Sequence, residues 1–342
     1  MRFVFRADAS LEIGTGHVVR CLTLADELRG RGADTAFLCR GEPGSLNALV
    51  ASRGHNIQAI APGTDDAEQC AGYLGQARPD WIVVDHYALD RAWEAAARRF
   101  AGKVFVIDDL ADRHHDCDLL LDQNLYDGVE TRYAPLVPPR CRQLIGPRFA
   151  LLRPEFAQVR ERLARKAGSV ARILVSFGGV DSANETARVL ACLQDVLPSA
   201  ALDVVIGPTN PHAAEIKALA SRHARATVHV GTDRMAELMS QADAFIGAGG
   251  STTWERLCLG LPSLALAAAE NQVPTLQRLG AMGAVQYVGR TSDLDATGVR
   301  TAVERFLADE DTRSAMVRIG MHLVDGKGAE RVADCLLGMG EE

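Results

Sequence analysis

Strand-like and helix-like segments alternate along almost the whole chain, beginning at its first residues. The segment RFVFR at 2–6 is rich in residues typical of strands, Gly14 and Gly16 follow it, and apolar residues then recur at helical spacing from Val18 to Leu28. Parallel strands need a crossover between them, so this alternation indicates a parallel sheet covered by helices. The pattern predicts the α/β fold class.

The alternation occurs in two series, which predicts two domains. The strand-like segments are TAFLC at 35–39, WIVVD at 81–85 and KVFVID at 103–108, then RILVSFGG at 172–179, LDVVIG at 202–207, DAFIGAGG at 243–250 and SLALAA at 263–268. A stretch with several prolines, ending at Pro147, separates the series, and 342 residues suit two domains of ordinary size. We expect two Rossmann-like, doubly wound domains, 1–150 and 151–342, facing across a ligand cleft, with a last helix at 329–337 returning across the hinge.

Composition excludes several classes of protein. Hydrophobic residues make up 47% of the chain and charged residues 24%, the balance of a folded globular protein. The net charge of −7, the 5% aromatic content and the lack of a basic run argue against a nucleic-acid partner. The longest apolar runs are far shorter than the roughly 20 residues of a membrane span. We therefore expect a soluble, cytoplasmic protein without a membrane partner, for which a monomer suffices.

The first candidate site is the loop RADASLEIGTGHVVR at 6–20. Gly14 and Gly16 let a ligand approach the backbone, and His17 falls in the first turn of the following helix. A neutral imidazole accepts a proton from water, and the positive end of a helix favours the neutral form. The alternative is a capping loop with a surface histidine, and the loop alone does not decide. It lacks the full GxGxxG pattern followed by an acidic strand end, which disfavours a nicotinamide site.

The segment GAGGSTTWERLCLGLP at 247–262 is a candidate nucleotide site. Gly249, Gly250 and Ser251 present amides at a helix start that suit a diphosphate, and Glu255, one turn later, suits the hydroxyls of a ribose. The alternative is that Ser251 merely caps the helix. Two glycines and an acid on one helix start favour the nucleotide.

Other segments place polar residues at predicted strand ends. The turn FGGVDSAN at 177–184 directs Asn184 inward, although an ordinary strand-to-helix turn explains it equally well. Further polar residues at strand ends are Asp85, His86, Tyr87, Asp108, Asp109, Asn271 and Gln272. Neither Tyr87 nor Asn271 is needed for a standard turn, so these two are the stronger candidates.

A metal site is the minority interpretation. Asp116 and Asp118 share a face if the segment there is a strand, and such acidic pairs occur in metal-dependent sugar-nucleotide enzymes. No HxxxH, HExxH or CxxC spacing supports a metal. The sequence also lacks a GxSxG turn and a Walker A motif, which argues against acyl-enzyme chemistry and against ATP hydrolysis on a P-loop.

Taken together, RADASLEIGTGHVVR, VVDHY, HHDCDLLLDQN, GPRFALLRPEF, FGGVDSAN, GAGGSTTWERLCLGLP and AENQ resemble the UDP-2,4-diacetamido-2,4,6-trideoxy-β-L-altropyranose hydrolases of pseudaminic acid biosynthesis. The segments occur in the family's order between Arg6 and Gln272. The resemblance implies a GT-B-like fold that holds UDP mainly in the second domain. It also implies cleavage of the sugar C–O bond with inversion at the anomeric carbon, without a metal or another cofactor.

The resemblance also implies residue roles. His17 takes the catalytic role and activates or orients the attacking water. The expected substrate-binding residues are Arg6, Asp8, Gly16, Tyr87, Asn184, Gly249, Gly250, Ser251, Glu255, Asn271 and Gln272. A glycosyltransferase of the same fold that uses a related UDP-sugar is an alternative, and exposed apolar side chains in the first domain would favour it. A non-catalytic sugar-nucleotide sensor is another, and it has little need of His17.

Overall fold

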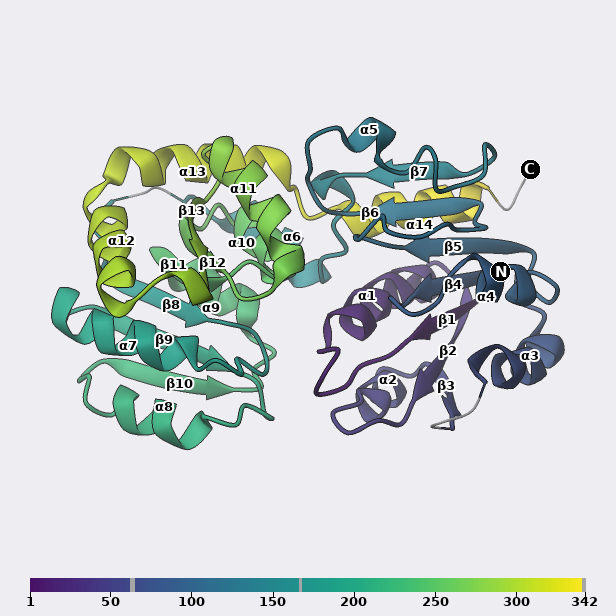
Figure 1. Cartoon of the computed structure of the whole chain (residues 1–342), viewed down its shortest axis with the longest axis horizontal. Coiled ribbons are helices and arrows are strands. Elements are labelled where there is room, and N and C mark those ends of the chain that lie inside the picture. Colours follow the sequence, from purple (N-terminus) through teal and green to yellow (C-terminus); the bar gives the residue numbers. More distant parts are fainter. Residues whose placement is uncertain (62–64, 166–167, 340–342) are drawn as a thin grey trace. The chain divides into compact units, whose positions relative to one another are not determined.

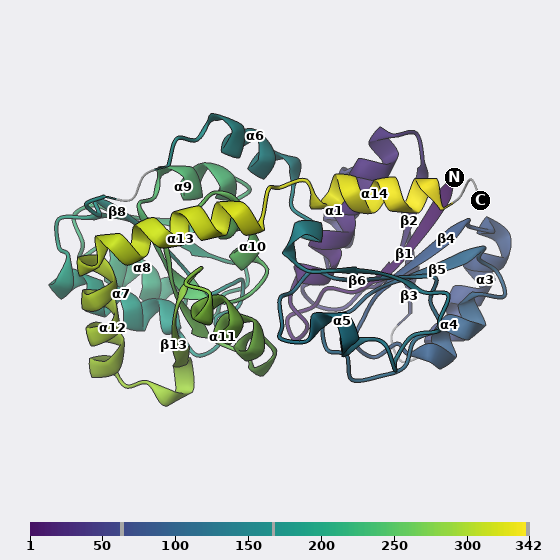
Figure 2. The ribbon, with the colours of Figure 1, turned by 90° about the horizontal axis from the view of Figure 1, so that it is seen from above.

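The computed structural model describes residues 1–61, 65–165 and 168–339, which form two compact units (Figure 1). The first contains Met1–Arg153 and the segment that begins at Lys327, and the second is Pro154–Gly326. The predicted division after residue 150 is close to the observed one. The second unit does not extend to residue 342, however, because the last helix, α14 (Gly328–Gly338), packs along α1 (Gly16–Gly30) in the first unit (Figure 2).

The first unit is a parallel sheet of seven strands in the order β3-β2-β1-β4-β5-β6-β7. The strands are β1 (Arg2–Ala7), β2 (Asp34–Arg40), β3 (Asn56–Ile60), β4 (Trp81–Asp85), β5 (Lys103–Ile107), β6 (Leu119–Asp122) and β7 (Arg142–Ile145). The other helices are α2 (Asn47–Ser52), α3 (Asp66–Ala77), α4 (Arg91–Ala97), α5 (Val129–Arg132) and η1 (Pro147–Phe149). Side chains alternate between the faces, so Phe3 and Phe5 pack in one core with α1 and α14, while Val4 packs in the other with α3 and α4.

The second unit is a parallel sheet of six strands in the order β10-β9-β8-β11-β12-β13. The strands are β8 (Arg172–Ser176), β9 (Ala201–Ile206), β10 (Ala226–Val230), β11 (Ala244–Ala248), β12 (Ser263–Ala267) and β13 (Gln286–Arg290). The helices are α6 (Pro154–Arg162), α7 (Glu185–Val196), α8 (Ala213–Ala220), α9 (Met235–Gln241), α10 (Thr252–Cys258), η2 (Glu270–Gln272), α11 (Val273–Ala281), η3 (Thr291–Asp293), α12 (Ala296–Ala308) and α13 (Glu310–Leu323). Within the described ranges, none of the helices combines the length and the apolar character that a membrane-spanning helix needs.

Each sheet has one topological switch point, where strands that are distant in sequence lie side by side. These neighbours are β1 and β4 in the first unit, and β8 and β11 in the second. In the first unit the helices that follow them cover opposite faces, since α1 belongs to one core and α4 to the other. The carboxyl ends of strands at a switch point are where open α/β sheets bind ligands. The predicted site residues are therefore best considered at these two places.

Candidate functional site

His17 lies at the switch point of the first unit, in the first turn of α1. Its Nδ1 atom is 2.5 Å from Oδ1 of Asp85, the last residue of β4. The two residues meet because β1 and β4 pair in parallel, with Ala7 opposite Asp85, and the loop after β1 leads into α1. Both side chains are buried, so His17 is a fixed group and not the surface histidine of the alternative interpretation.

Arg20 holds Asp85 in its charged form. It lies one turn after His17 on α1, and its Nε and Nη2 atoms each donate to one oxygen of Asp85 at 2.6 Å. Burial alone would raise the pKa of Asp85, but the charge and hydrogen bonds of Arg20, with the hydrogen bond to His17, outweigh it and hold that pKa well below its usual range. We assign the imidazole proton to Nδ1, where the carboxylate accepts it. Neutral His17 then carries its free lone pair on Nε2, the atom able to accept a proton.

Tyr87 packs edge-on against His17. The ring centroids are 4.6 Å apart at an interplanar angle of 86°, and Tyr87 is 37% exposed. Burial and the neighbouring Asp109 raise the pKa of Tyr87, which keeps its hydroxyl protonated. Asp109 also lies 3.4 Å from Arg20. The structure thus brings two predicted residues, His17 and Tyr87, together with three charged residues at one edge of the sheet.

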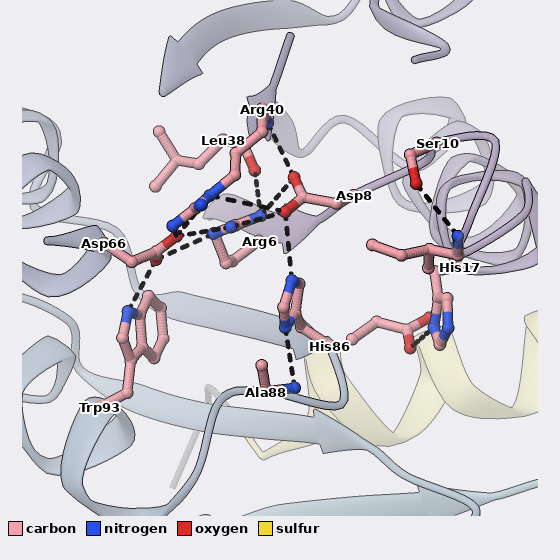
Figure 3. Close-up of polar contacts among 12 residues, drawn as sticks. Arg6, Asp8, Ser10, His17, Leu38, Arg40, Asp66, His86, Ala88 and Trp93 are labelled. Carbon is pink, nitrogen blue, oxygen red and sulfur yellow. Dashed lines mark hydrogen bonds and ion pairs between the residues drawn. The ribbon is translucent and has the colours of Figure 1, made fainter. Parts of the chain in front are cut away.

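Arg6 differs from its expected role. Its guanidinium is fully buried and donates to Asp8 at 2.6 and 2.8 Å and to Asp66 at 3.1 and 2.6 Å (Figure 3). The guanidinium has no exposed surface, and these carboxylates and the carbonyl of Leu38 at 3.4 Å occupy its donors, so this structure offers Arg6 no direct contact with a ligand. The charge of Arg6 is instead needed to keep two adjacent carboxylates stable inside the unit.

The predicted residue Asp8 is also almost fully buried. Its carboxylate accepts from Arg6, from the backbone of Arg40 at 2.7 Å and from Nε2 of His86 at 3.1 Å (Figure 3). The amide of Ala88 donates to Nδ1 of His86 at 3.0 Å, so we assign the proton of this imidazole to Nε2. Asp8 is therefore first a support for its neighbours, although it also borders a cavity described below.

The glycine-rich turn of the second unit contains two glycines with different functions. A Cβ added to Gly249 would lie 2.4 Å from Cδ1 of the buried Leu276, so this position must be glycine for packing against α11. A Cβ on Gly250 would have only Nε2 of Gln272 nearby, at 3.9 Å. Ser251 is exposed at the N-cap position of α10, and its side chain makes no capping hydrogen bond there. The interpretation that the Ser251 side chain caps the helix is thus wrong.

The other predicted residues of the second unit lie at neighbouring strand ends. Asn184 precedes α7 in the left-handed conformation, with φ of 57°, and its Nδ2 donates to Glu215 at 2.8 Å. Its Oδ1 is buried and accepts no hydrogen bond among the described residues. Asn271 is exposed in η2, and Oε1 of Gln272 accepts from Ala268 at 3.0 Å. These turns follow β8 and β12, which flank β11 and its glycine-rich turn, while Glu255 is half-buried in the first turn of α10.

The acidic pair considered as a metal site is held by arginines. Asp116 and Asp118 precede β6 and lie outside any strand, and Arg98 contacts them at 3.0 and 2.8 Å. Arg140 pairs with both carboxylates as well. Within 1–61, 65–165 and 168–339, no group of three or more His, Cys, Asp or Glu side chains has the arrangement of a metal site.

Sequence reasoning missed the partners of His17. The sequence marks Asp85 and Asp109 only as polar residues at strand ends, and it does not mark Arg20. The spacing of three residues between His17 and Arg20 places them on one face of a helix, which is the signal that was available. The contact with Asp85 depends on strand order and had no local signal.

Comparison with known proteins identifies distant relatives. No family model matches the chain. The chain is 25% identical to the UDP-2,4-diacetamido-2,4,6-trideoxy-beta-L-altropyranose hydrolase of Campylobacter jejuni over 83% of this chain and 97% of the relative. It is 25% identical to the spore coat polysaccharide biosynthesis protein SpsG of Bacillus subtilis over 98% of both. An uncharacterized protein of Methanocaldococcus jannaschii is 26% identical over 78% of this chain, which spans only 55% of that protein's length.

Solved structures establish the fold class. MurG of Acinetobacter baumannii superposes with a TM-score of 0.69 at 15% identity, covering 98% of this chain and 99% of MurG. The calicheamicin glycosyltransferase CalG4 gives a TM-score of 0.66 at 16% identity, over 98% and 97% of the two chains. The UDP-GlcNAc 2-epimerase of Neisseria meningitidis, solved with UDP-GlcNAc, gives 0.63 at 13% identity, over 98% and 99%. The predicted GT-B-like fold of two Rossmann-like units is confirmed, and so is the similarity to the hydrolases.

Proposed function

We propose that this protein is an enzyme of pseudaminic acid biosynthesis that hydrolyses UDP-2,4-diacetamido-2,4,6-trideoxy-β-L-altropyranose to UDP and the free sugar. The observation that carries the proposal is the buried His17, oriented by Asp85 at a switch point. A sensor has no use for a histidine whose proton-accepting atom is held in place in this way. The similarity to the Campylobacter jejuni hydrolase along nearly its whole length supports the substrate.

In this mechanism Nε2 of His17 accepts a proton from a water molecule while the oxygen of that water attacks the anomeric carbon. The bond between that carbon and the diphosphate oxygen breaks, and UDP leaves with the electron pair. Attack from the face opposite UDP inverts the anomeric centre. Asp85 stabilises the imidazolium that forms, as a hydrogen-bonded carboxylate does for a catalytic histidine.

The second unit would bind the leaving group. The amides at Gly250 and Ser251 stabilise the charge that develops on the diphosphate, and Glu255 accepts the ribose hydroxyls. The remainder of the substrate would contact Asn184, whose Oδ1 accepts no hydrogen bond among the described residues, and the exposed Asn271. Beside His17, Tyr87 and Gly16 would also contact the substrate. None of these steps requires a metal.

The test is proton and phosphorus NMR of the purified protein with this UDP-sugar in buffer that contains EDTA. The expected result is release of UDP with the free sugar appearing first as the inverted anomer. His17→Asn should lower kcat by about 100-fold or more, the usual contribution of a general base, whereas His114→Asn, a change at an exposed histidine, should not. Substrate that binds without UDP release would contradict hydrolysis, and a His17→Asn variant with a kcat near that of the parent would contradict the base.

A glycosyltransferase is the second candidate. Leu11 and Ile13, in the loop that leads to His17, are 45% and 44% exposed, and such side chains meet the criterion for an acceptor surface. UDP release that occurs only after an acceptor alcohol is added would favour this candidate over the hydrolase.

A further inference from the structure

The first unit contains a cavity of about 610 Å³ that the mechanism above does not use. Its walls are the loop at 10–13, the turn at 42–43 and the segment at 88–89, and its floor consists of Asp8, Arg40, Asp66 and His86. The cavity lies at the carboxyl ends of β1, β2 and β4, and it is formed by this unit alone. Its volume is in the range of about 300–1,000 Å³ that is typical of small-molecule sites.

The walls of the cavity are held in place by backbone contacts. Leu11 N donates to the carbonyl of Pro43 at 3.0 Å. A Cβ on Gly44, whose φ is +86°, would lie 2.9 Å from that same nitrogen, so only glycine allows the turn to approach the loop this closely. Within the loop, Ser10 Oγ accepts from Ile13 N at 3.0 Å. The cavity is therefore preformed.

The floor of the cavity is polar but electrically balanced. Asp8 and Asp66 are neutralised by Arg6 and Arg40 in one connected network, and Trp93 Nε1 donates to Asp66 at 2.9 Å (Figure 3). Glu12 and Glu42 add two further carboxylates to the wall, and Arg40 is the one arginine in the lining. A phosphate or another anion would gain little from such surroundings. The floor suits hydrogen bonds to a neutral ligand.

The upper wall of the cavity is apolar. Leu11 and Ile13 expose nearly half of their side chains, and Pro43 and Leu89 lie with them in the lining. Exposed apolar side chains around a preformed cavity indicate a ligand with methyl or methylene groups. Balanced polar groups below and apolar groups above together match a neutral sugar whose hydroxyls are partly replaced by acylamino or deoxy groups.

The cavity adjoins the proposed base through two connections. The loop that carries Leu11 and Ile13 continues directly into His17, and His86 of the floor is followed by Tyr87, which packs on His17. In the proposed mechanism the anomeric carbon lies beside His17, at the same carboxyl edge of the sheet as the cavity, and we place the substituents of the sugar ring in the cavity on that basis. In a hydrolase the acceptor is a water molecule, so the cavity is not needed for an acceptor and is free for substituents of the sugar.

We propose that this cavity is the subsite for the methyl-bearing substituents of the sugar, its acylamino and deoxy groups, and that Leu11 and Ile13 determine specificity for them. The inference rests on the proposed function, since it concerns the same substrate. The selectivity comes from apolar contact, so a sugar with hydroxyls at these positions gains less free energy on binding.

Steady-state kinetics of Leu11→Ser and Ile13→Ser with the diacetamido-trideoxy UDP-sugar test the proposal. Each change should raise KM about tenfold with kcat changed less than threefold, while calorimetry shows unchanged affinity for UDP alone. The matched control is Leu49→Ser, which should leave KM as in the parent. Leu49 is an apolar residue of the same unit, is 38% exposed and does not line the cavity. An unchanged KM for the UDP-sugar in both test variants overturns the proposal. A result in which the KM for an acceptor rises while the KM for the UDP-sugar does not also overturns it.

Saturation-transfer NMR separates this proposal from the proposed function. The probe is the free 2,4-diacetamido-2,4,6-trideoxy sugar, whose binding needs no hydrolysis. Saturation of its acetyl methyl protons by the parent, reduced in Leu11→Ser and retained in Leu49→Ser, supports the subsite even if UDP is never released. Absence of saturation in the parent, or equal saturation in Leu11→Ser, contradicts it even if hydrolysis occurs.

Discussion

His17 Nδ1 lies 2.5 Å from Asp85 Oδ1, although the two residues are 68 positions apart in the chain. The pairing of β1 with β4 makes this contact, and Arg20 keeps the carboxylate charged. A charged partner on Nδ1 defines which nitrogen of the imidazole is free to accept a proton. The relationship gives Asp85 a positioning role that can be measured.

Asp85→Asn should lower kcat by about 100-fold with KM changed by less than threefold, because an amide neither requires the proton on Nδ1 nor stabilises the imidazolium. Steady-state kinetics with the UDP-sugar would show the split between kcat and KM. Asp112→Asn, at an exposed carboxylate, is the control. A purely structural role for Asp85 predicts instead that the active fraction falls while kcat per folded molecule stays constant.

Glu255→Ala should weaken binding of UDP about tenfold or more, since a hydrogen bond to a charged group contributes about 1.5–3 kcal/mol. Isothermal titration calorimetry with UDP alone measures this without catalysis. Glu237→Ala, a change at a glutamate of the same unit whose side chain is 45% exposed, should bind UDP as the parent does. Equal affinity of Glu255→Ala and the parent would remove Glu255 from the nucleotide site.

Gly249→Ala and Gly250→Ala should have opposite consequences, although the residues are adjacent. The methyl group at Gly249 collides with Leu276, so this change should cost about 1–3 kcal/mol of unfolding free energy, as overpacking does. The methyl group at Gly250 meets open space, so stability should stay within about 0.5 kcal/mol of the parent while UDP affinity falls. Urea unfolding and calorimetry measure the two effects. Equal destabilisation by both changes would show that Gly250 is also a packing residue.

Tyr133 places its single hydroxyl proton between two carboxylates. Its oxygen is 3.0 Å from Oδ2 of Asp108 and 3.0 Å from Oδ2 of Asp122, and it can donate to only one of them. Burial and the charge of Asp109 raise the pKa of Asp122 to about 7 although Arg132 lies 3.6 Å away, whereas Asp108 is paired more closely with Arg113 at 2.9 Å. We infer that Asp122 is the protonated member, donating to Tyr133, which in turn donates to Asp108.

This arrangement predicts a stability that depends on pH above the usual range for an aspartate. Between about pH 4 and pH 7 folded Asp122 retains a proton that the unfolded chain has released, so its contribution to stability is fully present at low pH and is lost as the pH rises to about 7. Asp122→Asn keeps a donor for Tyr133 and has no charge to bury. Its stability relative to the parent should therefore rise by about 2.5 kcal/mol from pH 5 to pH 8, measured by urea unfolding at both values. A constant difference would show that Asp122 is charged throughout.

The central strands of both sheets could be predicted because their signal is local. WIVVD, RILVS and SLALA are buried on both faces, which produces unbroken apolar runs at β4, β8 and β12. The four strands that were not predicted, β3, β7, β10 and β13, are the outer strands of their sheets. Outer strands are only partly covered, so their residues alternate less clearly and carry little apolar signal.

By itself the sequence determined the fold class, the division into two series and the turns that carry His17, Asn184 and Gly250, since strand propensity and glycine placement are properties of neighbouring residues. Tertiary structure decided which residues meet. Contacts between distant parts of the chain bury Arg6, give His17 its partner and return α14 to the first unit. They also produce the collision that distinguishes Gly249 from Gly250. Such contacts depend on strand order and side-chain packing, and no spacing within a single segment encodes them.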